Sequence, residues 1–258
     1  MMGWWKRRRR KKLRQQPFNP AWREAIAANF EIFTCLEPAE QEQLLDHVKV
    51  LLGEKHFEAC GGLELTDEIK VIIAAQAGLL LMHRETEYFS RLKSILVYPS
   101  SYFGQTLDDE SDENAHRLGE SWDTGVVILA WDSVLGGAHN RTDGQNLVFH
   151  EFCHQLDQED GLADGLPILA DGDDTVLERH EKYTTWSQVL SHHYKVFVER
   201  TERGHRTVLD SYGATNPAEY FAVATECFFE KSRSMKQNLP QLYEVLHQYY
   251  RLDPVQWH

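Results

Sequence analysis

Residues 146–157, with the sequence NLVFHEFCHQLD, contain the motif HExxH. On a helix, residues four positions apart lie one above the other on the same face. His150 and His154 can therefore direct both imidazoles at one metal ion, for which zinc is the usual choice. Glu151 is turned by about 100° around the helix from His150. It lies beside the ion rather than on it, where it can take a proton from a water molecule that the metal activates.

Three local features support a metal-binding helix at this short motif. Thr142 and Gln145 have the T-x-x-Q spacing of a capping box, which predicts the start of the helix. Apart from Glu151, the neighbours of the two histidines on the helix carry no charge, so the site can exclude water; they are Val148, Phe149, Phe152, Cys153, Gln155 and Leu156. Gly161 predicts the end of the helix within two turns. The alternative is an amphipathic core helix whose two histidines are merely hydrogen-bonded.

The charge of the 258-residue chain is unevenly distributed. Residues 1–14 carry eight basic groups and no acid, although the whole chain has a formal net charge of −13. The remaining residues therefore have 19 basic against 40 acidic groups, a net charge of −21. Such an acidic body repels phosphates, so we expect no binding of nucleic acid.

The composition predicts a basic, disordered arm over residues 1–19 and a single domain over residues 20–258. The alternative for the arm, which includes Trp4 and Trp5, is contact with anionic lipid or nucleic acid. The apolar run over residues 71–82 is too short to span a bilayer, so no stable membrane insertion is expected. The four cysteines are far apart and form no CxxC pair, which indicates reduced thiols in a cytoplasmic protein.

Hydrophobic periodicity and capping residues predict the other elements. Helices are expected over residues 20–30, 37–52, 66–82 and 176–203, and strands over residues 94–98 and 125–131. The acidic stretch 107–123 is predicted to be a solvated loop; the alternative is a surface that attracts cations or basic peptides.

A second helix can complete the metal site, because catalytic zinc usually has three protein ligands and one open position. In the stretch YGATNPAEYFAVATECFFE, residues 212–230, Asn216 is the expected N-cap and Pro217 the first helical residue. Glu219 and Glu226 are both candidate ligands, and at this spacing they lie on the same helix face. Glu219, near the helix start, can project toward a cleft. Glu226 suits a supporting role, in which it accepts a hydrogen bond from the other nitrogen of a ligand histidine.

These motifs resemble the Mlc titration factor A family of bacterial zinc metallopeptidases. HEFCHQLD, YGATNPAEYFAV and ECFFE carry the resemblance, which extends over residues 20–254. It implies that Glu219 is the third zinc ligand. The family's site is similar to that of the anthrax lethal factor catalytic domain, in which a tyrosine seven residues before the ligand glutamate faces the site. Tyr212 has this spacing; the alternative is a packed tyrosine with a structural hydroxyl.

The resemblance implies a cytosolic protein with one zinc ion per chain and aminopeptidase-type activity on small peptides. It also implies that enteric relatives bind Mlc, a sugar-responsive repressor. We therefore expect a mostly helical α+β, zincin-like metallopeptidase with a small sheet beside the HExxH helix. In this interpretation His150, His154 and Glu219 hold zinc, Glu151 is the general base, and Tyr212 donates to the oxyanion.

The alternative function is a non-catalytic regulator that binds a transcription factor and uses zinc as a structural element. A structural zinc site normally has four protein ligands and needs no general base. The sequence offers three evident ligands and Glu151, which favours an enzyme.

Overall fold

The computed structural model describes residues 2–84, 86–100 and 125–257 of the chain. The acidic stretch 107–123 lies outside these residues. The chain divides into two compact units, Met1–Met82 with Leu92–His139 and His83–Arg91 with Asn140–His258. In the described part of the chain no helix is both long and apolar enough to cross a membrane.

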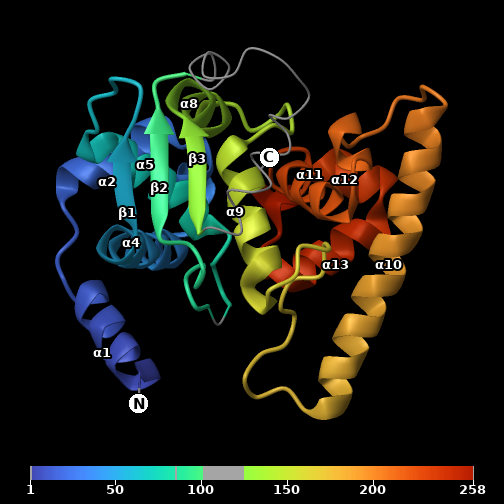
Figure 1. Cartoon of the computed structure of the whole chain (residues 1–258), viewed down its shortest axis with the longest axis horizontal. Helices are drawn as coiled ribbons and strands as arrows, with labels where there is room; N and C mark the ends of the chain where they lie inside the picture. Colours follow the sequence, from blue (N-terminus) through green and yellow to red (C-terminus); the bar gives the residue numbers. More distant parts are fainter. Residues whose placement is uncertain (1, 85, 101–124, 258) are drawn as a thin grey trace. The chain divides into compact units, whose positions relative to one another are not determined.

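The first unit contains a three-stranded parallel sheet in the order β1-β2-β3 (Figure 1). Its strands are β1 (His56–Ala59), β2 (Ser94–Tyr98) and β3 (Val126–Ala130). Ile95 of the central strand is paired with Phe57 on one side and Val127 on the other. Branched side chains suit such strands, and alternate residues of β2 and β3 are buried, as in a sheet with one face on the core.

The helix α5 (Asp67–Leu79) is the buried centre of the first unit. The side chain of Thr66 accepts a hydrogen bond from the Ile69 amide and caps the helix, and the residues from Ile73 to Leu79 are all buried. The helix packs against α4 (Pro38–Glu54) and α2 (Pro20–Asn29). The unit also contains α3 (Glu31–Cys35) and α8 (Trp131–His139).

The basic N-terminal segment, predicted to be a disordered arm, forms the helix α1 (Met2–Arg14). This helix packs on α4. The Arg10 guanidinium donates from Nε to Glu54 Oε1 at 2.9 Å and is buried. The Leu13 side chain lies over Gly53, where there is no side chain to keep it away. Charge composition alone does not reveal such docking, because it depends on residues forty positions later.

The second unit is helical. Its helices are α9 (Leu147–Asp157), α10 (Val176–Glu202), α11 (Pro217–Glu230), α12 (Ser232–Asn238) and α13 (Pro240–Tyr250), with 3₁₀ turns η1 (Gln158–Asp160), η2 (Ser211–Ala214) and η3 (Pro254–Trp257). The long α10 runs alongside α13 (Figure 1), and α11 packs on α9. Aromatic rings fill the core; Phe228 and Phe229 of α11 both contact Tyr250 of α13.

The predicted helices and strands are confirmed to within a few residues at their ends, and so is a mostly helical α+β fold. The predicted start of the HExxH helix is wrong. Asn146 is the N-cap of α9, since its side chain accepts a hydrogen bond from the Phe149 amide at 3.0 Å. Thr142 and Gln145 belong instead to the preceding loop.

Gly165 holds the loop that follows α9 in place. Its amide donates to Asp157 Oδ2 at 2.9 Å, and its carbonyl accepts from Trp186 Nε1 at 2.9 Å. Its φ is +77°, and a Cβ added there would lie 2.6 Å from the Pro217 carbonyl oxygen. Both the backbone conformation and the available space therefore require glycine.

Replacing Gly165 with alanine is expected to lower the free energy of unfolding by about 3 kcal/mol, because left-handed strain and overlap with backbone add together. Urea denaturation measures this change. Gly204→Ala is the matched control, since Gly204 has a φ of +70° but nothing within 4 Å of an added Cβ. Its cost is expected to be only about 1 kcal/mol. Equal effects of the two substitutions would contradict the role assigned to the Pro217 contact.

Candidate metal centre

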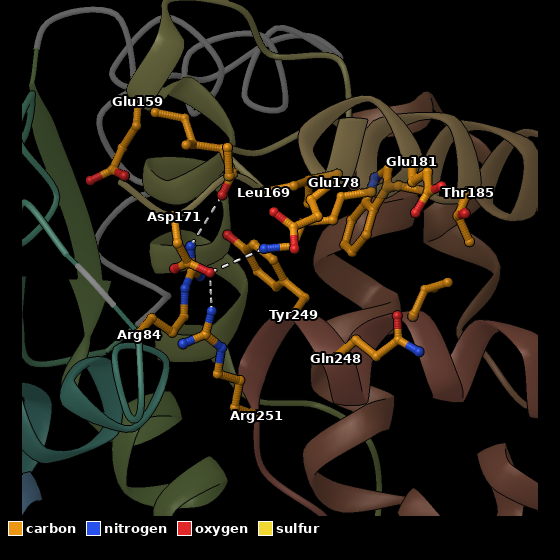
Figure 2. A pocket seen from close by; sticks show the side chains of 15 residues that line it. Arg84, Glu159, Leu169, Asp171, Glu178, Glu181, Thr185, Gln248, Tyr249 and Arg251 are labelled. Carbon is orange, nitrogen blue, oxygen red and sulfur yellow. Dashed lines mark hydrogen bonds and ion pairs between the residues drawn. The ribbon is translucent and has the colours of Figure 1, made fainter. Parts of the chain in front are cut away.

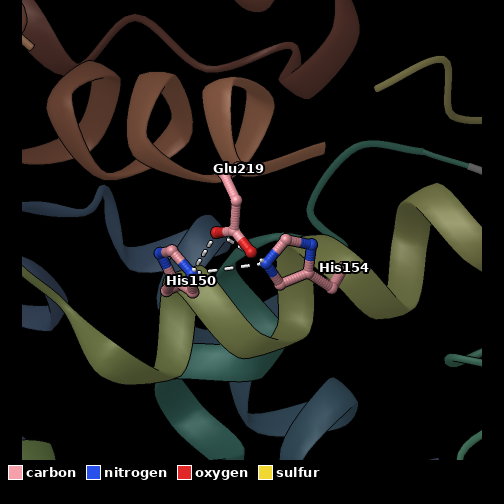
Figure 3. A group of neighbouring side chains, drawn as sticks. All are labelled: His150, His154 and Glu219. Atoms are coloured by element: carbon pink, nitrogen blue, oxygen red, sulfur yellow. Dashed lines mark hydrogen bonds and ion pairs between the residues drawn. The ribbon is translucent and has the colours of Figure 1, made fainter. Parts of the chain in front are cut away.

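The three predicted metal ligands converge between α9 and α11. His150 and His154 lie one turn apart on α9, and Glu219 extends toward them from the first turn of α11 (Figure 3). The two Nε2 atoms are 3.3 Å apart, and Glu219 Oε2 lies 3.0 Å from His150 Nε2 and 3.4 Å from His154 Nε2. The side chains of the three residues point toward one another (Figure 3).

These distances suit a zinc ion. Zinc bonds of 2.0–2.1 Å in a tetrahedral site place neighbouring ligand atoms about 3.3–3.4 Å apart. The three observed separations are close to that value. Two imidazole nitrogens and one carboxylate oxygen are a donor set that zinc accepts, and three protein ligands leave a fourth position open. The residues present therefore fit the ion that the motif predicts.

Glu226 supports this group from the same face of α11. Its Oε1 accepts a hydrogen bond from His150 Nδ1 at 2.8 Å, and its Oε2 accepts one from the Asn146 amide at 2.6 Å. With Nδ1 occupied in this way, the ring of His150 is oriented so that Nε2 faces Glu219 and His154. The hydrogen bond that the sequence analysis expected between Glu226 and a histidine of the motif is present.

The pKa values of the two histidines are shifted in opposite directions. For His154, burial is the largest influence and lowers the pKa to about 4, so its imidazole is neutral at pH 7. Burial also opposes the charge of His150, but hydrogen bonds to Glu219 and Glu226 outweigh it and raise the pKa to about 10. Burial would raise the pKa of Glu219, yet hydrogen bonds to both histidines lower it to about 2. A bound cation would replace the proton of His150, so metal binding releases protons.

The predicted general base is a buried residue of the same helix as the two histidines. Glu151 is buried on α9, 4 % exposed, between the two histidines in sequence. Burial raises the pKa of Tyr212, and the negative charges of Glu219 and Glu151 raise it further.

Tyr212 lies at the open side of the group. Its ring centroid is 5.9 Å from that of His150, and 43 % of its surface is exposed. The side chains of His154 and Glu219 are almost fully buried, whereas His150 is 15 % exposed. A substrate can therefore approach at the side of His150 and Tyr212.

Two supporting residues were not identified from the sequence. Asn146 both caps α9 and donates its amide to Glu226, and Asp210 caps η2 by accepting from the Tyr212 amide at 2.9 Å. Their signal was present, since each is an Asn or Asp directly before a helical turn. Asp157, at the end of α9, holds the Gly165 loop by accepting a hydrogen bond from the Gly165 amide.

Another cavity of the second unit, about 340 Å³ in volume, lies between the 168–171 segment, α10 and α13 (Figure 2). Three of its charged groups, Asp171, Lys182 and Arg251, form ion pairs with one another. Asp171 accepts from Lys182 at 3.1 Å and from Arg251, and the Arg84 guanidinium lies 3.9 Å from the centre of the Tyr249 ring. We interpret these contacts as an ion-pair network that holds the 168–171 segment against α10 and the end of α13. The metal-binding group does not line this cavity.

Comparison with known proteins identifies relatives along nearly the whole chain. The model of the glucose-regulated metallo-peptidase M90 family matches residues 3–251. An uncharacterized protein, slr2042, of Synechocystis sp. is 37 % identical over 253 residues, which are 96 % of this chain and 89 % of that protein. Proteins named Mlc titration factor A from Yersinia pestis and Yersinia pseudotuberculosis are each 29 % identical, over 91 % of this chain and 85 % of theirs. The resemblance predicted from the motifs is confirmed.

Replacing Glu226 with glutamine is expected to weaken zinc binding about 10- to 100-fold, because an amide holds His150 Nδ1 less firmly than a carboxylate does. Competition with a chromophoric chelator measures the affinity. Glu230→Gln is the matched control on the same helix. Burial raises the pKa of Glu230 to about 9, so glutamine resembles its neutral form, and unchanged affinity is expected. Equal losses in both variants would show that the effect does not pass through His150.

Proposed function

The chain belongs to the glucose-regulated metallo-peptidase M90 family, and we propose that it is a zincin-like, zinc-dependent peptidase of the aminopeptidase type. The observation that carries this proposal is the convergence of His150, His154 and Glu219. Glu151 follows His150 directly on α9, and the half-exposed Tyr212 ring lies 5.9 Å from the His150 ring. One zinc ion per chain is proposed, held by the two Nε2 atoms and the Glu219 carboxylate. The aminopeptidase preference rests on the family resemblance.

The chain's own residues then have separate roles. Zinc, when bound, polarises the scissile carbonyl and lowers the pKa of a water molecule. Glu151 accepts the proton of the attacking water and later delivers it to the leaving amine. The Tyr212 hydroxyl donates to the carbonyl oxygen as negative charge develops on it. Glu226 keeps His150 oriented while the charge of the site changes.

Buried, uncharged residues next to the ligands support this assignment. The neighbours of the ligands on α9, Phe149, Phe152 and Cys153, are fully buried. Burial raises the pKa of Cys153 well above its usual value, so it remains a thiol and does not compete as a metal ligand. Exclusion of water strengthens the interaction of a carboxylate base with a developing charge. The free cysteines agree with the proposed cytoplasmic location.

The name Mlc titration factor A, carried by relatives at 29 % identity, favours a second function. We propose that a repressor of the Mlc type, where the host has one, binds a surface separate from the metal centre. Calorimetric titration of the purified repressor with wild type and with Glu151→Gln tests this idea. Equal affinity for both is expected, and a loss of affinity in the variant would place the partner at the catalytic group.

Glu151→Gln is expected to retain about one zinc per chain but to lose at least 100-fold in kcat, because general-base catalysis contributes that much or more. Metal analysis and hydrolysis of a fluorogenic aminoacyl substrate measure both properties. His154→Ala is expected to lose zinc as well as activity. Glu181→Gln, at an exposed position of α10, is the control that should change neither. If wild type and Glu151→Gln hydrolyse the substrate equally, Glu151 is not the base and the regulator becomes the leading function.

Tyr212→Phe is expected to lower kcat by about 100-fold and to leave KM and zinc content nearly unchanged, as removal of an oxyanion donor does. Tyr194→Phe is the matched control, because the Tyr194 hydroxyl donates a hydrogen bond to the Ala214 carbonyl of the same 3₁₀ turn. A comparable loss of kcat in Tyr194→Phe would mean that the position of the turn matters and the Tyr212 hydroxyl does not.

A further inference from the structure

The helix α1 has two distinct faces. At about 100° per residue, Lys6, Arg10 and Leu13 lie on one side of the helix, which is the side turned toward α4. Arg10 is 5 % exposed there. Trp4 and Trp5 begin the opposite side and are 58 % and 64 % exposed. The exposed cations Arg8, Lys11 and Lys12 continue the same side, so this outward face consists of two tryptophans and three central basic groups.

Contacts with α4 hold this face outward. Besides the Arg10–Glu54 ion pair, Arg9 Nη2 donates to the Gly53 carbonyl at 2.6 Å, and Lys49 donates to the carbonyl of Gln16 at 3.1 Å. Every one of these contacts lies on the inward side or at the C-terminal end of α1. The tryptophans and the outward cations are therefore presented by an anchored helix, which differs from a mobile basic arm.

The charges of α1 oppose its own stability. Its first turn contains no acidic residue to offset the helix dipole. Arg8 and Lys12 are like charges four residues apart, as are Arg7 and Lys11, and such pairs destabilise a helix. An anionic surface placed against the outward face would relieve this repulsion. The rest of the chain has a net charge of −21. Among the described residues, its ion pair with α1 is formed by Glu54 with Arg10 on the inward side of the helix.

We propose that α1 is a peripheral membrane-binding element, whose outward face binds the surface of an anionic phospholipid bilayer. Tryptophan rings favour the level of the lipid headgroups, and Lys and Arg beside them attract anionic lipid. The helix lies in the interface with its tryptophans in the headgroup region and does not cross the bilayer. This binding is independent of the metal centre, which belongs to the other unit.

A bilayer suits this face better than a nucleic acid does. The rings of Trp4 and Trp5 are 4.9 Å apart and nearly perpendicular, at 80°, so they form no parallel platform for successive bases. The guanidinium of Arg8 already lies 5.4 Å from the centre of the Trp4 ring. Headgroups require no such platform, because an indole with an apolar body and a polar N–H can enter the interface at any tilt.

Vesicle sedimentation with the full-length protein tests the charge contribution. The wild type is expected to bind vesicles that contain phosphatidylglycerol, more weakly as salt rises, and to ignore pure phosphatidylcholine. Each cation contributes about fivefold, so Arg8→Gln with Lys11→Gln and Lys12→Gln should weaken binding about 100-fold. The matched control neutralises the exposed Lys195, Arg203 and Arg206, and should change binding less than about twofold.

Tryptophan emission tests the insertion. Phosphatidylglycerol vesicles are expected to shift the emission of the wild type to shorter wavelength, and the double variant W4A/W5A should lose this shift and bind at least tenfold more weakly. Zinc content and peptide hydrolysis should be unchanged in all variants, which shows that they fold. Absent binding, equal binding to neutral vesicles, equal losses in the matched control, or tighter binding to a DNA or RNA duplex would each overturn the proposal.

Discussion

The carboxylate of Glu226 joins the two helices that carry the candidate metal ligands. One oxygen accepts a hydrogen bond from His150 Nδ1, and the other accepts one from the backbone amide of Asn146, the N-cap of α9. A hydrogen bond to a charged group is worth about 1.5–3 kcal/mol, and a buried carboxylate that lost both partners would cost more than that. The register between α9 and α11 is therefore fixed by a buried charge. Because Glu219 lies two turns earlier on the same face, the same contact also sets how far Glu219 reaches toward the histidines.

The support continues behind the ligands. Asp157 at the end of α9 holds the Gly165 amide, and Gly165 lies against Pro217, the first residue of α11. The start of α11 is thus confined on one side by a loop from the end of α9, while the middle of α11 is tied to the start of α9. Two helices connected at both ends allow little change in the distance between their side chains. This rigidity is what a metal site requires, since ligand atoms must stay within tenths of an ångström.

Much of the site could be predicted from the sequence because it depends on local spacing. His150 and His154 share a face in any helix, and Asn216 with Pro217 begins α11 as their cap preferences indicate. The choice between Glu219 and Glu226 could not be made from spacing, since both occupy one face, and only the packing of α11 on α9 separates them. The capping box failed for a local reason. The side chain of Asn140 accepts from the Thr142 amide, and that of Asp143 from the Gln145 amide, so both residues belong to Asx turns.

The same distinction between local and distant contacts explains why Tyr212 is harder to predict than the ligands. It stands on the four-residue turn η2, whose position depends on packing against α11 as well as on its own capping residues. At Gly213 an added Cβ would be only 3.3 Å from Val223 Cβ and 3.4 Å from Tyr220 Cα, so the turn packs directly on the helix. Asp210 fixes its start, and Thr215 Oγ1 donates to the Tyr212 carbonyl at 2.7 Å. The ligands are thus held by helices in the core, whereas the tyrosine hydroxyl is positioned by a short turn at the open side. If Tyr212 is the proposed donor, this placement lets its hydroxyl adjust to a substrate without moving His150, His154 or Glu219.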